Sequence, residues 1–253
     1  MHDLAADAAV LRALHRAGEP LMLANVWDAA TASVVAKTGA NAIATSSIAV
    51  AMSHGLPDQD VMPLDIAFGA VAAVSAAVEV PVTADIEAGY QLDAPELVRR
   101  LLDAGAVGCN IEDTDHHGTR GFVPVAEQAE RLAAIRAAAT AAGVPIVLNA
   151  RIDLFHGNDG APAESLAEAI ERGRAYLAAG ADCVYPIFLG DATLVKQFVL
   201  GVGGHVNVNV RPGGLSAREF AALGVSRIST GGGLFFMAMT AVKDAARALT
   251  ASV

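Results

Sequence analysis

The chain has 253 residues, of which 54% are hydrophobic and 17% are charged, and its formal net charge at pH 7 is −10. This apolar content can fill a large core and excludes a disordered or fibrous protein, while the acidic balance gives no basic surface for nucleic acid or an anionic membrane. The length is close to the roughly 250 residues of one barrel domain, so we predict a single domain over residues 1–253.

Eight short apolar runs recur along the chain, and most of them end in a polar side chain. In chain order the runs are Leu21–Asn25, Ala42–Ser46, Val82–Asp85, Gly108–Glu112, Ile146–Asn149, Cys183–Pro186, Val206–Asn209 and Arg227–Thr230. Stretches with apolar residues at helical spacing lie before, between and after these runs, at Asp3–Ala17, Asp28–Thr38, Leu64–Val78, Ala94–Ala104, Val125–Ala142, Ala163–Ala179, Ala192–Leu200, Ser216–Leu223 and Leu234–Leu249. The alternation predicts an α/β fold, a (β/α)8 TIM barrel whose parallel strands present their C-terminal ends on the functional face.

Two kinds of residue support this prediction. Five predicted helices end in glycine, which allows the left-handed turn that closes a helix before the next strand; these are Gly39, Gly105, Gly143, Gly180 and Gly224. The two cysteines, Cys109 and Cys183, fall inside predicted strands, so we expect buried free thiols and neither a disulfide nor a metal pair. No apolar stretch reaches the length of a membrane span and the N-terminus has no signal pattern, so we expect a cytoplasmic protein without a membrane partner.

Acidic residues follow two neighbouring predicted strands. Asp85 ends one run and Glu87 follows it, and Glu112 ends the next run and Asp113 follows it. Carboxylates at adjacent strand ends repel one another unless a cation lies among them, and Mg²⁺ prefers such oxygen ligands. We therefore predict a Mg²⁺ site, with Mn²⁺ left open, although Glu87 and Asp113 could instead cap the following helices or face solvent.

Several residues at strand ends could bind the anionic part of a substrate. Arg151 could clamp a carboxylate bidentately or form a salt bridge with Asp153. Ser46 and Ser47 offer hydroxyls and successive amide groups for an anion. Buried amides at strand ends can orient a ligand or satisfy neighbouring backbone; we select Asn25 and Asn209 as candidates for the substrate site.

Two further segments carry candidate functional groups. The segment after Asp113 holds His116, His117 and Thr119 beside glycines that permit hinging. Histidine titrates near neutral pH and could act as an acid or base, or could simply be solvated. Arg211, after a strand end, could reach a second carboxylate of a dicarboxylic substrate.

Six motifs occur together along the chain. They are Asn25-Val26-Trp27-Asp28-Ala29, Ala44-Thr45-Ser46-Ser47, Gly55-Leu56-Pro57-Asp58, Ala84-Asp85-Ile86-Glu87-Ala88-Gly89-Tyr90, Asn110-Ile111-Glu112-Asp113 and Asn149-Ala150-Arg151-Ile152-Asp153. In identity, order and spacing they resemble the isocitrate lyase/phosphoenolpyruvate mutase superfamily, especially its short phosphonomutase-like members, over about the whole chain. The resemblance implies a Mg²⁺-dependent barrel enzyme that makes or breaks a C–C or P–C bond next to an α-keto acid or its enolate.

The resemblance also implies roles for individual residues. Asp85 would hold the metal, Glu87 and Glu112 would support it through bound waters, and Asp58 would lie near the reacting centre. Arg151 and the amides around Ser46 and Ser47 would hold the substrate carboxylate. The resemblance further implies a homo-oligomer, a tetramer or dimer, in which a swapped C-terminal helix packs on a neighbouring subunit, although the run Leu234–Met239 could equally close this barrel's own helical ring.

The chain departs from the family in the segment 114–122. Superfamily lyases for isocitrate and methylisocitrate have a cysteine and lysines in this loop, and mutases have a longer loop with lysine and asparagine, but this segment has none of these. We therefore predict a Mg²⁺-dependent carbon–carbon lyase or decarboxylase for a small α-keto acid or 2-hydroxy dicarboxylate, acting through an enolate. The alternatives are a phosphonopyruvate hydrolase or mutase that acts on a P–C bond, and a non-catalytic keto-acid-binding barrel.

Overall fold

The structure, a computed structural model, describes residues 3–118, 121–156 and 163–251. Its strands are β1 (Leu21–Leu23), β2 (Asn25–Val26), β3 (Ile43–Thr45), β4 (Val82–Asp85), β5 (Gly108–Glu112), β6 (Val147–Ile152), β7 (Cys183–Pro186), β8 (His205–Asn209) and β9 (Arg227–Ser229). All pair in parallel, in the order β1-β9-β8-β7-β6-β5-β4-β3-β2. Only Ala24 separates β1 from β2, so these two segments form the first barrel strand and the sheet closes on itself, which confirms the predicted (β/α)8 barrel.

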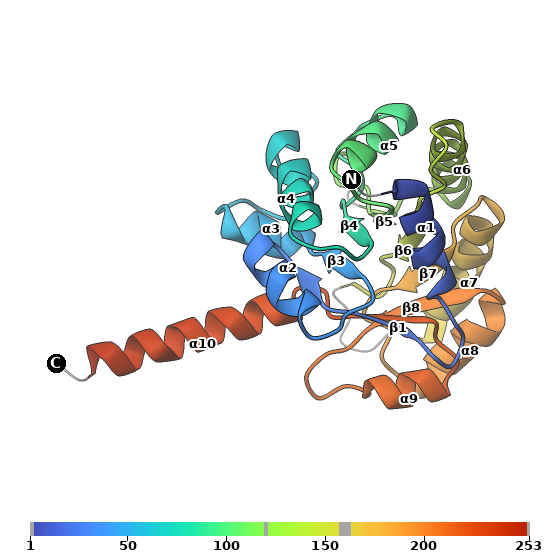
Figure 1. Cartoon of the computed structure of the whole chain (residues 1–253). Helices are drawn as coiled ribbons and strands as arrows, with labels where there is room; N and C mark the ends of the chain where they lie inside the picture. The colour runs from blue at the N-terminus through green and yellow to red at the C-terminus, as the bar shows by residue number, and fades with distance from the viewer. Residues whose placement is uncertain (1–2, 119–120, 157–162, 252–253) are drawn as a thin grey trace.

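The helices surround the sheet, as Figure 1 shows. They are α1 (Leu4–Ala13), α2 (Ala29–Ala36), α3 (Ser47–Ser53), α4 (Leu64–Ala76), α5 (Ala94–Asp103), α6 (Val125–Ala141), α7 (Ala163–Ala178), α8 (Ala192–Val202), α9 (Ala217–Ala222) and α10 (Gly233–Thr250). The five glycines predicted to end helices all have a positive φ, between 74° and 104°. These turns connect each helix to its next strand without steric strain.

The two ends of the barrel differ in character. Leu11 of α1 packs with Leu21, Val107 and Val147 at the N-terminal ends of the strands, and these residues belong to one buried apolar cluster. Both cysteines are free and buried, as predicted. Apolar packing therefore closes one end of the barrel, and the polar strand ends remain at the other.

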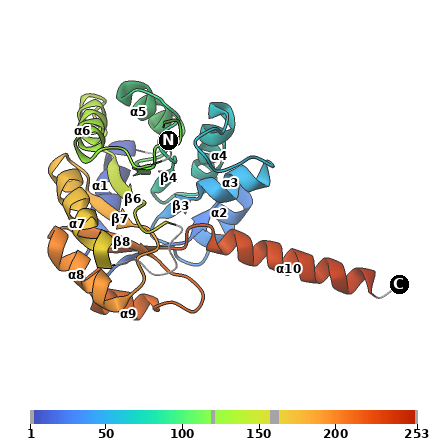
Figure 2. The ribbon, with the colours of Figure 1, turned by 180° about the vertical axis from the view of Figure 1, so that it is seen from behind.

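Helix α10 does not complete the helical ring of its own barrel. Both views show it extending away from the barrel, with the C-terminus at its far end (Figures 1 and 2). Phe235 is its only buried residue, whereas Phe236, Met237 and Val242 are exposed. This arrangement excludes the alternative in which Leu234–Met239 closes the ring. Among the described residues, no helix combines the length and apolarity needed to cross a membrane.

Candidate active site

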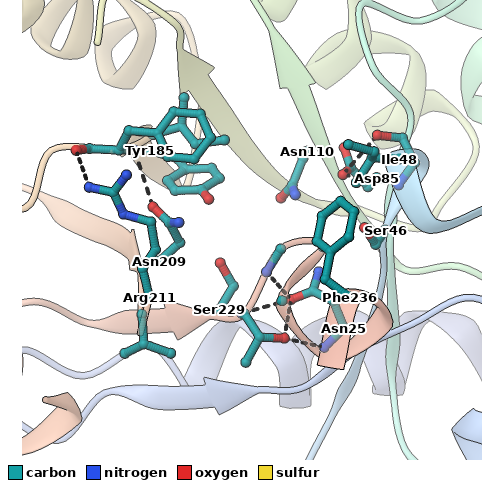
Figure 3. Close-up of a pocket in the computed structure, with 18 of the residues that line it drawn as sticks. Asn25, Ser46, Ile48, Asp85, Asn110, Tyr185, Asn209, Arg211, Ser229 and Phe236 are labelled. Carbon is teal, nitrogen blue, oxygen red and sulfur yellow. Dashed lines mark hydrogen bonds between the residues drawn. The ribbon is translucent and has the colours of Figure 1, made fainter. Parts of the chain in front are cut away.

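A cavity of about 600 Å³ opens among the C-terminal ends of the strands. Figure 3 shows Asp85 and Ser46 on one side, Asn209 and Arg211 on the opposite side, and Asn110 between them. Eight of the predicted site residues line this cavity: Asn25, Ser46, Ser47, Asp58, Asp85, Arg151, Asn209 and Arg211. The fold therefore brings together side chains from positions 25 to 211 of the sequence.

Asp85 is the last residue of β4, and only one of its two carboxylate oxygens has hydrogen-bond partners. Its Oδ2 accepts hydrogen bonds from the backbone N and the Oγ of Ser47, both at 3.2 Å. Its backbone N donates to Thr45 Oγ1 at 2.9 Å. Its Oδ1 is buried without a hydrogen-bond partner. One oxygen of Asp85 is therefore fixed and the other is available to a ligand.

Ser46 and Ser47 both line the cavity, and their backbone amides have acceptors within the protein. The backbone N of Ser46 donates to Val26 O at 3.1 Å, and the backbone N of Ser47 is used by Asp85. Both amides thus already have acceptors within the protein, and the contact of this segment with a substrate carboxylate stays a prediction. The Oγ of Ser46 is buried and has no hydrogen-bond partner, so it remains available to a substrate. The unpredicted helix α3 causes this arrangement, since Ser46 is its N-cap.

Asp58 lies close to Asp85 on the wall of the cavity. Burial, followed by the neighbouring charge of Asp85, raises the pKa of Asp58 to about 6, although a hydrogen bond from Ser47 opposes the shift. Its Oδ1 is buried and has no hydrogen-bond partner. A carboxyl group with a pKa near neutrality can both accept and donate a proton at physiological pH.

Glu87 lies beneath this pair and is almost completely buried. Its Oε2 accepts a hydrogen bond from the backbone N of Asp60, and its Oε1 has no partner. Burial raises the pKa of Glu87 to about 8, helped by the charges of Asp58, Glu112 and Asp85. Glu87 therefore neither caps a helix nor faces solvent. Its φ of +51° and that of Asp60, +56°, are strained for residues other than glycine, as is common at functional sites.

Arg151 joins the cavity to two acidic residues. Its Nε and Nη2 donate to Asp153 Oδ1 and Oδ2 at 2.6 and 2.9 Å, and its Nη1 lies 2.5 Å from Glu112 Oε2. Both interpretations made from the sequence therefore hold in part, since Arg151 forms salt bridges and also lines the cavity. A guanidinium has five N–H donors, so two remain for a substrate.

The two predicted loop histidines bind carboxylates and do not line the cavity. His116 Nε2 lies 2.5 Å from Glu112 Oε1, and this hydrogen bond is the main reason that the pKa of His116 is raised. His117 Nε2 lies 2.9 Å from Asp60 Oδ2. Each imidazole thus pairs with a buried carboxyl group. Thr119, the third candidate from this segment, lies outside the described residues.

Asp113 is fully buried in a network behind the site. Its Oδ2 accepts hydrogen bonds from Tyr176 Oη at 2.8 Å and from Arg172 Nη1 at 3.1 Å. Its Oδ1 accepts from the backbone N of Asp153 at 2.9 Å. Asp113 therefore neither caps a helix nor faces solvent. It fixes the backbone of Asp153, the residue whose carboxylate binds Arg151.

The surroundings of Asn25, which begins β2, differ from those of Asn209, which ends β8. Asn25 Nδ2 donates to Thr45 O at 2.7 Å, and its Oδ1 accepts from the backbone N of Thr230 and of Gly231. Asn25 thus ties β2 to two neighbouring segments. Asn209 Oδ1 accepts from the backbone N of Phe188 at 3.1 Å, which leaves its amide nitrogen beside the cavity.

Arg211 lines the cavity opposite Asp85 (Figure 3). Its Nη2 donates to Phe188 O at 3.3 Å, and its guanidinium lies 5.2 Å from the centre of the Phe188 ring. Arg151 is neutralised by two acids, whereas Arg211 forms no salt bridge with any described residue. The far side of the cavity therefore carries an unbalanced positive charge.

Several cavity residues were not predicted from the sequence. They are Asn110, His156, Tyr185, Phe188, Ser229 and Phe236. Tyr185 and Ser229 lie in predicted strands, and the period-two alternation of a strand could have placed them on the inner face. Phe188 and His156 lie in connections whose path the sequence does not reveal.

The acidic side chains suit a hard divalent cation. Unpartnered buried oxygens occur on Asp58, Asp85 and Glu87, and such oxygens are the donors that Mg²⁺ prefers. In the described part of the chain, however, no three acidic, histidine or cysteine side chains form a preformed ligand set. This donor set fits an ion held by one or two carboxylates and by waters.

Comparison with known proteins gives a consistent result. Residues 11–250 match the family model for phosphoenolpyruvate phosphomutase. A relative of unassigned activity from Mycobacterium tuberculosis strain H37Rv is 30% identical over 239 residues, covering 94% of this chain and 87% of the relative. The 2-methylisocitrate lyase of Bacillus subtilis strain 168 is 31% identical over 196 residues, covering 74% of this chain and 62% of the lyase.

The fold comparison agrees. A crystal structure from Burkholderia cenocepacia J2315, provisionally assigned as a phosphonomutase, superposes with a TM-score of 0.88 at 36% identity and covers 96% of this chain and 98% of that one. With the barrel, the motif order and the family model in agreement, the chain belongs to the phosphoenolpyruvate phosphomutase family of the isocitrate lyase/phosphoenolpyruvate mutase superfamily.

Proposed function

We propose that the chain is a Mg²⁺-dependent carbon–carbon lyase or decarboxylase, also served by Mn²⁺, that acts on a small α-keto acid or 2-hydroxy dicarboxylate through an enolate. The observation that carries the proposal is that Asp58, Asp85 and Arg151 face one cavity. These three side chains can supply an acid–base group, a ligand for a cation and a clamp for a carboxylate.

Arg151 would bind the carboxylate next to the reacting carbon. Glu112 and Asp153 occupy three of its five N–H groups and fix its orientation. The two remaining N–H groups, one on each terminal nitrogen, match the two oxygens of a carboxylate. The substrate would thus enter a guanidinium that is already ordered, which lowers the entropic cost of binding.

Asp58 would transfer the proton. In a 2-hydroxy dicarboxylate, the carboxylate of Asp58 takes the proton of the C2 hydroxyl, the hydroxyl oxygen becomes a carbonyl, and the C2–C3 bond breaks. The bonding pair passes to the C3 fragment as an enolate, which is then protonated on carbon. The raised pKa of Asp58 makes it a stronger base than an ordinary carboxylate. A divalent cation bound at Asp85 would act as a Lewis acid toward the substrate oxygens.

Arg211 supports a substrate with a second carboxylate. It lies across the cavity from Asp85, carries one hydrogen bond to Phe188 O, and has no acidic partner among the described residues. A second carboxylate would neutralise this charge, whereas a monocarboxylate would leave it unbalanced.

Cleavage of a P–C bond, as by phosphonopyruvate hydrolase or mutase, is the second candidate. The family model and the likeness to the Burkholderia cenocepacia structure favour it, and Asp58 would then lie near the phosphoryl group. Against it, no lysine is found among the described residues that line the cavity. A keto-acid-binding barrel without turnover is the third candidate.

The test is turnover of oxaloacetate, 2-methylisocitrate and phosphonopyruvate, with Mg²⁺ and after EDTA, by the wild type and by Asp85→Ala. Asp103→Ala, at an exposed aspartate on α5, serves as the matched control. We expect metal-dependent formation of a keto acid that EDTA and Asp85→Ala abolish and the control leaves intact. Phosphate released from phosphonopyruvate would support the second candidate, and Mg²⁺-dependent binding without turnover would support the third.

A further inference from the structure

Arg227 is a buried cation inside the barrel, and it has no ion-pair partner in the described ranges. It begins β9, is fully buried, and has unpartnered Nε and Nη1 atoms. Its one hydrogen bond to a side chain runs from Nη2 to Asn110 Oδ1, at 3.0 Å. A buried charge without a counter-ion costs stability, and the apolar packing of a barrel interior does not require it.

The contact with Arg227 determines the orientation of the Asn110 amide. A guanidinium only donates hydrogen bonds, so the group facing it must be the amide oxygen. The same oxygen accepts a second hydrogen bond from Asn149 Nδ2 at 2.7 Å. With both lone pairs of this oxygen engaged, the Nδ2 of Asn110 is the polar end that remains for the cavity, which Asn110 lines.

Asn110 lies at the level of the acidic side chains. Its register partner across the β4–β5 pair is Asp85, and Figure 3 shows it in the middle of the cavity, between Asp85 and Asn209. No described residue accepts a hydrogen bond from its Nδ2. The floor of the cavity thus presents an oriented donor where the oxygens of a bound keto acid would lie.

We propose that Asn110 donates a hydrogen bond to a substrate oxygen that gains negative charge during the reaction, and that Arg227 is a positioning residue that orients and polarises the Asn110 amide. This inference rests on the proposed function for the identity of the substrate. Preorganised donors of this kind stabilise developing charge without reorganising during the reaction, and a neighbouring cation strengthens the amide as a donor.

Arg227→Met separates this role from a structural one. Methionine is a long apolar side chain that can occupy the space of the arginine, and replacing a buried charge by an apolar side chain is often neutral or stabilising. We expect the urea midpoint of Arg227→Met to equal or exceed that of the wild type, while kcat falls about 10-fold to 100-fold. Asn110→Ala should lower kcat by about 10²–10³-fold, the loss typical of one oxyanion donor.

Two further variants sharpen the test. If Arg227 acts through Asn110, the double variant should be no slower than Asn110→Ala alone. Val98→Ala removes a buried side chain of α5 that does not line the cavity, and should lower the urea midpoint while kcat stays within about threefold of the wild type. A fully active Arg227→Met, or losses of kcat that multiply in the double variant, would overturn the inference.

A binding measurement keeps the inference testable if the wild type turns over no substrate of the panel. With Mg²⁺ present, calorimetry of pyruvate binding should show Kd values raised about 3-fold to 10-fold in Asn110→Ala and in Arg227→Met, the loss of one neutral hydrogen bond. Such a result would support the hydrogen bond from Asn110 to the ligand, even though the proposed reaction would be abandoned. Unchanged Kd values, or no pyruvate binding by the wild type, would overturn the contact itself.

Discussion

The arrangement of Arg151 predicts that lysine cannot replace it. Lysine keeps the positive charge but has only three N–H donors, on one nitrogen, where the guanidinium has five on three nitrogens, so it cannot make the three contacts with Asp153 and Glu112 and also donate two hydrogen bonds to a substrate carboxylate. Arg151 has two N–H groups left for the substrate. A hydrogen bond to a charged group contributes about 1.5–3 kcal/mol, so the loss of two costs about 3–6 kcal/mol. At about 1.4 kcal/mol per tenfold change, kcat/KM should fall by about 10²–10⁴.

The assay is kcat/KM for the best substrate of the panel, measured for variants whose folding is verified by urea denaturation. Arg136→Lys is the control, because Arg136 also uses its whole guanidinium, on Gly180 O, Ile146 O and Asp182, but does not line the cavity. The control should lower stability and leave kcat/KM within about threefold of the wild type. A folded Arg151→Lys that retains more than a tenth of the wild-type kcat/KM would refute the geometric argument.

Four other predictions follow from the same structure. Arg211→Gln should weaken the binding of oxaloacetate about 10-fold to 100-fold relative to pyruvate, as measured by calorimetry, because it loses a charge-assisted hydrogen bond; an unchanged ratio would exclude a second carboxylate site there. Arg172→Met should destabilise the protein by about 3–5 kcal/mol, since it leaves the buried Asp113 carboxylate without its cation. Glu168→Gln, at the exposed partner of Arg172, should lower the free energy of unfolding by no more than about 1 kcal/mol in the same urea titration. An equal loss in Arg172→Met and Glu168→Gln would contradict the argument from burial. Burial lowers the pKa of His15 to about 4, so between pH 6.5 and 4 the unfolded chain binds more protons than the folded one. As the pH falls through this range, the free energy of unfolding of the wild type should therefore decrease by about 3 kcal/mol relative to that of His15→Gln. Parallel curves of stability against pH would disprove this. Finally, we expect light scattering to show a homo-oligomer, a dimer or tetramer, whose mass falls in Met237→Glu because this exposed side chain of α10 would be buried between subunits; a monomeric wild type would contradict this expectation.

The sequence predicts the barrel well because its strand signals are local. Each apolar run has a glycine-ended helix before it or a polar residue at its end, and the five glycines adopt the expected backbone. Helix α3 was missed because its apolar stretch, Ile48–Met52, is too short to show a helical period. The projection of α10 could not be predicted, since an apolar helix face does not reveal which surface it covers.

The candidate site was predicted best where chemistry and strand ends coincide. Asp85 and Arg151 follow directly from their positions at the ends of strands. Arg227 could not be found in this way, because it begins its strand and its long side chain runs inside the barrel to Asn110. His116 was selected for its acid–base chemistry, which stays a prediction, but the sequence does not reveal that its partner is Glu112. Sequence reasoning identifies groups near the strand ends, but their partners depend on side-chain reach.

Helix α10 begins at the wall of the cavity, where Phe236 is one of the lining residues. The neighbouring Phe235 packs edge-on against Trp27, with ring centres 5.1 Å apart. From this attachment the helix runs for 18 residues, about 27 Å at about 1.5 Å per residue, into solvent. One end of this helix thus lies at the cavity and the other lies away from the barrel. The helix that projects from the barrel therefore also supplies part of the cavity wall, so a subunit that packed on α10 would contact the same helix that borders the candidate site.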